Sequence, residues 1–171
     1  DETFVLSELP IGAASLARDL AHSSAGACVT FEGWVRDRNI GRVVHRLDYQ
    51  AYAPLARAEG GKILAEARQR FAIVDARCVH RVGSLAVGEL AVWAGVSAGH
   101  RDAAFAACRY IIDEVKRRVP IWKNEHYADG ESGWTLAKDV GYLGDLARCF
   151  LDGDNARNSR HLDRCLRLDV A

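Results

Sequence analysis

The sequence lacks the features that mark membrane, secreted or nucleic-acid-binding proteins. No apolar run in its 171 residues approaches the roughly 20 needed to span a bilayer. The segment Asp1–Phe4 has neither the basic start nor the apolar stretch of a secretory signal. The formal net charge is zero, so no overall field draws the chain toward nucleic acid or membrane. We therefore expect a cytoplasmic protein in which anion binding depends on local groups of cations.

Disulfides and metal sites are not expected either. The five cysteines are scattered, and no two are spaced as C-x-x-C, which argues against a disulfide framework or a zinc site. Cys28, Cys78 and Cys108 lie in apolar patterns and are predicted to be small core residues. The sequence also contains no Walker loop, G-x-G-x-x-G, G-x-S-x-G or H-E-x-x-H motif.

Apolar periodicity predicts a single α+β domain. The helices expected from helical spacing are 10–21, 54–71 and 99–118, the last ended by a proline. The strands expected from alternation are 26–36, 43–51, 72–82 and 89–97, with turns at 36–42 and 83–88. In the second of these strands, one face is predicted to carry Val43, His45, Leu47, Tyr49 and Ala51. Helices mixed with adjacent strand pairs indicate the α+β class.

The pattern weakens toward the C-terminal end of the chain. Residues 143–150 and 162–166 each have the apolar spacing of one short helix. We therefore predict a domain at 1–139, followed by a C-terminal extension at 140–171 that contains two short helices.

Three groups of cations are candidates for binding an anion. They are Arg36, Arg38 and Arg42; His100 and Arg101; and Lys116, Arg117 and Arg118 with Lys123. A basic run at a helix C-terminus usually is a solvated cap, and we favour that interpretation for 116–118 taken alone. Cations at a helix N-terminus oppose the dipole, and free N–H groups there favour an anion, so for the second group both interpretations stay open.

Lys123 directly follows Trp122, and the large aromatic suggests an ordered, packed segment. A partly desolvated lysine among other cations is a candidate proton shuttle or nucleophile, although this names no reaction. The residues alone thus indicate an α+β domain with a basic phosphate-binding site.

Several segments resemble one family in order and spacing. They are 31–36 (FEGWVR), 49–52 (YQAY), 80–83 (HRVG) with 88–89 (GE), 96–105 (VSAGHRDAAF) and 112–125, which contains IDEVK and VPIWKNE. Over about residues 3–139 the chain resembles the large, catalytic subunits of molybdopterin synthase. The lysine-containing segment is the most specific part of the match.

The resemblance implies an α/β hammerhead-type fold with an additional small antiparallel sheet. It implies a homodimer of large subunits within a heterotetramer, with one ubiquitin-like small subunit docked at each end. That carrier holds sulfur as a thiocarboxylate on its C-terminal glycine. The implied reaction is transfer of two sulfurs to cyclic pyranopterin monophosphate, which forms the dithiolene of molybdopterin without a metal or cofactor in the synthase.

The resemblance also implies roles for single residues. Lys116 and Lys123 correspond to the catalytic lysines. The substrate-binding positions are Arg36, His100, Arg101, Glu125 and Lys138, of which the last stands where the family often has an arginine reaching into the neighbouring subunit's site. Asn124 replaces the usual basic residue between Lys123 and Glu125.

The length of the last predicted helix adds a geometric argument. Arg101 and Lys116 are fifteen residues apart in the sequence, which along one helix is roughly 22 Å. One small pterin does not span that distance, so the residues are expected to meet across two subunits.

Two other functions compete with this interpretation. The first is a non-catalytic module of the same fold that binds a phosphorylated ligand or a ubiquitin-like protein. The second is a nucleic-acid-binding domain, which the neutral charge and the lack of exposed aromatics between the cations disfavour. Single-turnover sulfur transfer tests the first, and salt-dependent oligonucleotide binding tests the second.

Overall fold

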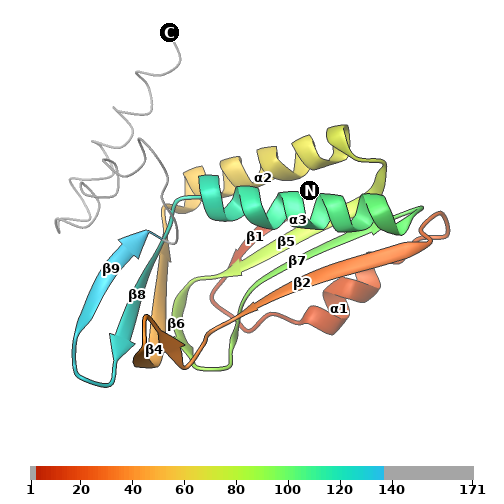
Figure 1. Cartoon of the computed structure of the whole chain (residues 1–171). Helices are drawn as coiled ribbons and strands as arrows, with labels where there is room; N and C mark the ends of the chain where they lie inside the picture. Colours follow the sequence, from red (N-terminus) through yellow and green to blue (C-terminus); the bar gives the residue numbers. More distant parts are fainter. Residues whose placement is uncertain (1–2, 137–171) are drawn as a thin grey trace, which may run out of the picture.

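A computed structural model describes residues 3–136 of the chain, and its larger sheet has four strands. In spatial order these are β1 (Phe4–Ser7), β5 (Ile73–Arg81), β7 (Leu90–Ala98) and β2 (Ala27–Trp34). Strand β1 is parallel to β5, and the other pairs are antiparallel. Helices α2 (Ala53–Arg70) and α3 (Arg101–Arg118) cover one face, and the short α1 (Ala13–Asp19) lies on the other (Figure 1).

The core lies between the two long helices and this sheet. The predicted stripe of α3 is buried throughout: Ala104, Cys108, Ile111, Ile112 and Val115. Strand β7 is buried over almost its whole length, as its apolar sequence predicted, because Trp93 and Leu20 cover its second face around Gly95.

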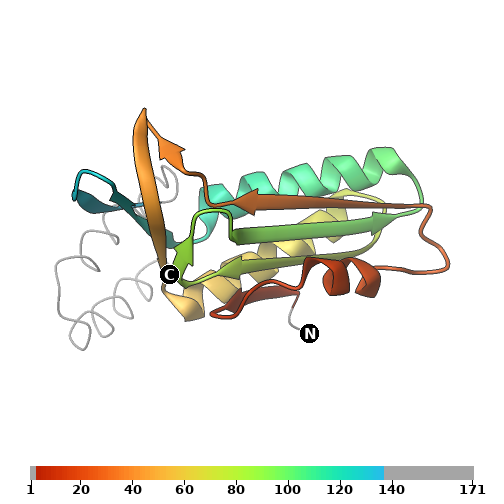
Figure 2. The same ribbon diagram turned by 90° about the horizontal axis from the view of Figure 1, so that it is seen from below.

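A second, antiparallel sheet stands crosswise at one end of the first (Figures 1 and 2). Its strands are β3 (Arg38–Asn39), β4 (Arg42–Ala51), β8 (Ile121–Tyr127) and β9 (Ser132–Leu136), and β6 (Gly83–Ala86) also pairs with β4. A small cluster of Val35, Leu47, Leu85 and Ala91 joins the sheets. The predicted turns at 36–42 and 83–88 therefore contain the short strands β3 and β6, and the prediction of turns alone was wrong.

The face predicted for strand β4 is wrong in its first half. A bulge between Val44 and Arg46 shifts the register, so Val44 is buried while Val43 and His45 are exposed. One extra residue in a strand moves the following side chains to the opposite face. Cys28 is also exposed, contrary to the predicted core position, whereas Cys78 and Cys108 are buried as expected.

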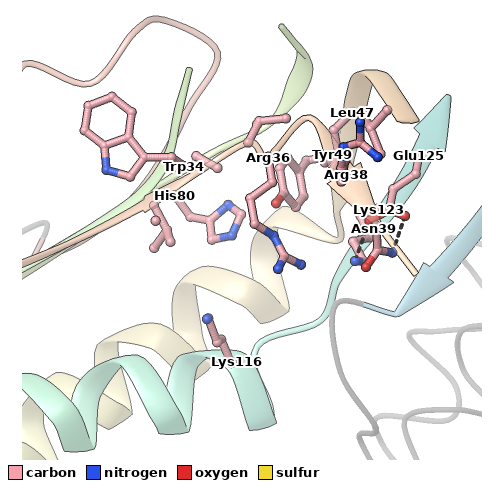
Figure 3. A pocket seen from close by; sticks show the side chains of 15 residues that line it. Trp34, Arg36, Arg38, Asn39, Leu47, Tyr49, His80, Lys116, Lys123 and Glu125 are labelled. Atoms are coloured by element: carbon pink, nitrogen blue, oxygen red, sulfur yellow. Dashed lines mark hydrogen bonds and ion pairs between the residues drawn. The ribbon is translucent and has the colours of Figure 1, made fainter. Parts of the chain in front are cut away.

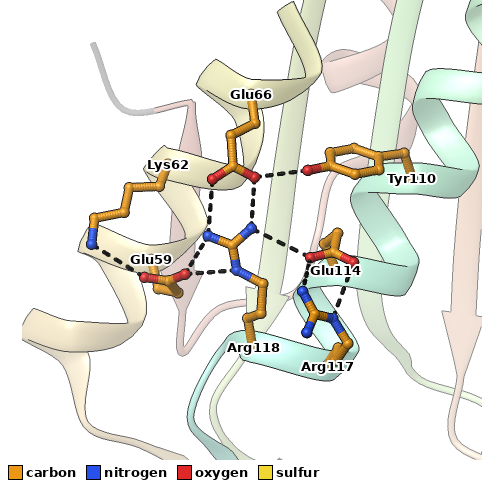
Figure 4. A network of polar contacts seen from close by, with 7 residues as sticks. All are labelled: Glu59, Lys62, Glu66, Tyr110, Glu114, Arg117 and Arg118. Atoms are coloured by element: carbon orange, nitrogen blue, oxygen red, sulfur yellow. Dashed lines mark hydrogen bonds and ion pairs between the residues drawn. The ribbon is translucent and has the colours of Figure 1, made fainter. Parts of the chain in front are cut away.

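The C-terminal turn of α3 is tied to α2 by a charged network (Figure 4). The Arg118 guanidinium donates to Glu59 and Glu66 of α2 and to Glu114 of its own helix. Glu66 also accepts from the Tyr110 hydroxyl at 2.7 Å. These contacts fix the direction in which the chain leaves α3 and enters β8.

Some predictions lie outside the described residues. These are the extension at 140–171, the domain boundary at 139 and the position of Lys138. Within residues 3–136, no helix is both long and apolar enough to cross a membrane.

Candidate active site

A pocket of about 420 Å³ lies where the two sheets meet the C-terminal end of α3 (Figure 3). The wall comes from the end of β2 and the segment after it, from β3, β4, β5, β7 and β8, and from the last turn of α3. Its polar and charged lining residues are Arg36, Arg38, Asn39, Tyr49, His80, Lys116, Lys123 and Glu125. Four of the predicted site residues thus come together: Arg36, Lys116, Lys123 and Glu125.

Lys116 reaches the pocket from the last turn of α3. Its Nζ lies 5.5 Å from the centroid of the Phe31 ring. Successive helical residues point about 100° apart, so the three consecutive cations at this end have different surroundings. Arg117 pairs with Glu114 at the surface, whereas Arg118 turns toward α2. The interpretation as a solvated cap therefore fits Arg117 but not Arg118 or Lys116.

Lys123 is held by the carboxylate of Glu125 on the same face of β8. Its Nζ lies 2.8 Å from Glu125 Oε1, and Glu125 Oε2 accepts from Asn39 Nδ2 at 2.6 Å and from the Tyr127 hydroxyl. Burial by itself raises the pKa of Glu125, but the hydrogen bonds from Lys123, Tyr127 and Asn39 outweigh it and lower the pKa. Glu125 is therefore an ionised partner that fixes the position of Lys123.

The charge of the pocket suits an anionic ligand. Its lining contains four cationic side chains, Arg36, Arg38, Lys116 and Lys123, and one carboxylate, Glu125. Arginine and lysine in a concave site bind phosphate by charge-assisted hydrogen bonds. Among residues 3–136, no group of three or more His, Cys, Asp or Glu side chains is placed to hold a metal ion.

Comparison with known proteins shows the family. The profile of the family described as "MoaE protein" matches residues 6–118. The chain belongs to the MoaE family. A relative named molybdopterin synthase catalytic subunit, from Synechococcus elongatus, is 45% identical over 131 residues, or 75% of this chain and 78% of the relative. The resemblance predicted from the sequence is confirmed.

Solved structures agree with the fold. The crystal structure of molybdopterin synthase from Staphylococcus aureus has a TM-score of 0.73 at 32% identity and covers 79% of this chain and 97% of that one. A complex of subunits 1 and 2 of molybdopterin-converting factor from Helicobacter pylori has a TM-score of 0.68, covering 83% and 96%. At 17% identity, the second match shows the fold alone. The predicted α+β class and the enzyme class, a molybdopterin synthase catalytic subunit, are confirmed.

Two predicted residues of this MoaE-family chain lie far from its pocket. His100 precedes the first residue of α3 and Arg101 is that residue, whereas Lys116 is in the last turn of the same continuous helix. Neither His100 nor Arg101 lines the pocket. Within one chain the structure therefore does not bring them to the lysines.

Asn124 is not part of the pocket wall. Lys123 and Glu125 face the pocket, and the alternation of β8 places Asn124 on the other side of the strand, where it is 9% exposed. A basic residue at position 124 would therefore also point away from the pocket of its own chain.

Four residues of the site were not predicted from the sequence. Asn39 and Tyr127 hold Glu125, and Tyr49 and His80 line the wall behind the lysines. Burial, together with the charge of Glu125, raises the pKa of Tyr49 to about 12, so its hydroxyl stays protonated at neutral pH. Tyr49 and His80 lie in the segments that resemble the family, which was the one available signal.

Proposed function

We propose that this pocket is the sulfur-transfer site of molybdopterin synthase. Sulfur passes from the thiocarboxylate of a ubiquitin-like small subunit to cyclic pyranopterin monophosphate. The observation that carries the proposal is the meeting of Lys116 and Lys123, from α3 and β8, with two arginines around one pocket. This cationic pocket suits a phosphorylated substrate and a negatively charged sulfur donor.

The surroundings of the two lysines suggest different roles. Lys123, fixed by Glu125, stabilises negative charge that develops during transfer. Lys116, which extends over the Phe31 ring, acts as acid/base or transient covalent partner. Arg36 binds the substrate phosphate, and Arg38 beside it supports the same contact.

The complete site needs a second copy of the chain. Because α3 is continuous, His100 and Arg101 are proposed to join Lys116 and Lys123 of the partner chain, within a homodimer that carries two small subunits. The Helicobacter pylori structure, which shares this fold, is a complex of subunits 1 and 2 of molybdopterin-converting factor. The division at 139, the role of Lys138 and the cytoplasmic location remain predictions.

Reconstitution with purified components tests the function. The chain, a thiocarboxylated carrier and the phosphorylated pterin should together form the dithiolene product. Lys116→Ala should abolish transfer with an unchanged melting temperature, because it removes a group at the reacting atoms. Lys62→Ala is the matched control, since Lys62 lies on α2 with its side chain 66% exposed.

The outcomes separate the competing functions. Near-normal turnover by Lys116→Ala would refute the catalytic role of that lysine. Binding of the phosphorylated pterin by the unmodified chain, without sulfur transfer in a single turnover, would favour the non-catalytic binding module.

A further inference from the structure

His80 is a buried polar residue in the wall of the pocket. It is the next-to-last residue of β5, is 7% exposed, and lies in Figure 3 between Trp34 and Tyr49, above Lys116. Its ring meets the Tyr49 ring edge-on, with centroids 5.0 Å apart at an interplanar angle of 83°. The proposed roles of the lysines and arginines leave this imidazole without a function.

The hydrogen bond of the ring fixes its tautomer. Nδ1 lies 2.8 Å from the carbonyl oxygen of Arg81, which can only accept, so Nδ1 carries the proton. Nε2 is then left with its lone pair. Together with the contact to Tyr49, this bond holds the ring plane and makes Nε2 an oriented acceptor.

The imidazole is also uncharged at neutral pH. Desolvation and, to a smaller extent, the charge of Lys116 lower the pKa of His80 to about 4, against the opposing effect of the Arg81 carbonyl. The other charged groups that line the same pocket are Arg36, Arg38, Lys123 and Glu125.

The pocket has many donors and few uncommitted acceptors. Its four cationic side chains only donate, and both oxygens of Glu125 already accept hydrogen bonds. Cations suit the phosphate of the substrate, but a pterin ring also presents N–H and amino donors. A buried N–H without an acceptor costs binding free energy.

We propose that His80 is a substrate-recognition residue, and that its Nε2 accepts a hydrogen bond from an N–H or amino group of the pterin ring. This inference rests on the proposed function and extends it from the phosphate to the ring. His80 thereby favours a ring with a donor at that position over an analogue with an acceptor there.

Two amide variants distinguish the roles of the two ring nitrogens of His80. His80→Gln places its amide near Nε2 and keeps an acceptor toward the pocket, whereas His80→Asn places its amide near Nδ1 and keeps only the contact with the Arg81 carbonyl. We expect His80→Asn to raise KM for the pterin by about tenfold or more, with KM for the thiocarboxylated carrier unchanged. His80→Gln should keep most of the affinity for the pterin. His45→Asn, at an exposed strand position, is the matched control.

Several outcomes would overturn the proposal. They are an unchanged pterin KM in His80→Asn, equal losses in both amide variants, and a fall in kcat alone, which would indicate an effect through Lys116. If both variants misfold, the ¹⁵N shift of Nε2 in the unmodified chain decides: it should move on pterin binding, and no movement refutes the contact. An unmodified chain that binds pterin with this shift but transfers no sulfur would refute the proposed function and leave this contact standing.

Discussion

At the scale of single residues, the two lysines of the pocket differ in what surrounds them. Lys123 is paired with a carboxylate that two further donors hold in place, Asn39 and Tyr127. Lys116 projects from a helix over an aromatic face and beside the neutral imidazole of His80. A lysine fixed by an anion suits charge stabilisation, whereas a lysine that extends over an aromatic ring suits proton transfer or covalent chemistry.

Glu125→Gln tests whether this carboxylate orients Lys123 or binds the substrate. The amide keeps an acceptor for Asn39 and Tyr127 but loses the charge that holds Lys123. We expect kcat to fall by about tenfold, because a hydrogen bond between charged groups is weakened. KM for the phosphorylated pterin should not rise, because the pocket becomes more cationic. Steady-state kinetics with each substrate varied in turn measures both constants.

The opposite pattern would show that Glu125 contacts the substrate. A raised pterin KM with unchanged kcat would agree with the substrate-binding role that the family resemblance implied. Glu8→Gln, in an exposed segment after β1, is the control for a loss of one negative charge.

The sequence predicted those site residues that lie in distinctive local motifs. Arg36, Lys116 and Lys123 were found because cations cluster next to a helix end, a turn or a tryptophan, and Glu125 was found only through the segment that resembles the family. Asn39 and Tyr127 were missed because an Asn in a turn and a Tyr in a strand are common surface residues. The pairing of β4 with β3 and β8 brings Asn39 to Glu125, whereas Tyr127 lies two residues after Glu125 on the same strand.

At the scale of elements, the joint between α2 and α3 sets the direction of the segment between the two lysines. Arg118 lies between Lys116 and Lys123 in the sequence, and its guanidinium contacts three carboxylates on the two helices (Figure 4). Hydrogen bonds from Arg118 and Tyr110 lower the pKa of Glu66 from 4.5 to about 2. The joint is therefore an acid-sensitive contact.

Glu66→Gln should make stability less dependent on pH in the acid range. The folded-state pKa of Glu66 is below its ordinary value of 4.5, so between that pH and about 2 the unfolded chain binds more protons. The contribution of Glu66 to the stability of the fold is complete above that pH range and is lost as the pH falls through it. Urea titrations from pH 7 to pH 3 should show a shallower loss in Glu66→Gln than in the unmodified chain.

The control for this comparison is Asp113→Asn, an exposed pair partner of Arg109 on the outer side of α3. The stability of Asp113→Asn should change with pH as that of the unmodified chain does, since exposed ion pairs contribute little to stability. Parallel curves for Glu66→Gln and the unmodified chain would show that Glu66 is not held in its charged form by Arg118.

The elements that the sequence predicts well are the long, periodic ones. Helices α2 and α3 and strand β7 agree with prediction to within one or two residues, because each buries a continuous apolar stripe or run. Strands β3 and β6 were taken for turns because they are two and four residues long. The bulge in β4 has no local sequence signal, since it arises where β4 pairs with β8.

At the scale of the whole molecule, the pocket lies at one end of α3, and His100 and Arg101 lie at the other. The helix has 18 residues, about 27 Å at the usual rise. A chain by itself therefore presents some of the proposed substrate contacts at one end and the others at the opposite end. Two copies related by a two-fold axis, with their α3 helices antiparallel, would complete two sites at once.

Mixing two inactive variants tests this arrangement directly. In a heterodimer of Lys116→Ala and Arg101→Ala chains, one site combines the intact Lys116 and the intact Arg101, while the other site has both defects. Half of the dimers in an equal mixture are heterodimers, so activity should recover to about 25% of the unmodified level once subunits have exchanged. A mixture of Lys116→Ala and Lys123→Ala is the matched control and should stay inactive, because both lysines line the pocket of the same chain. Recovery in neither mixture would mean that Arg101 does not serve the partner's pocket, and recovery in both would mean that the two lysines do not act in one site.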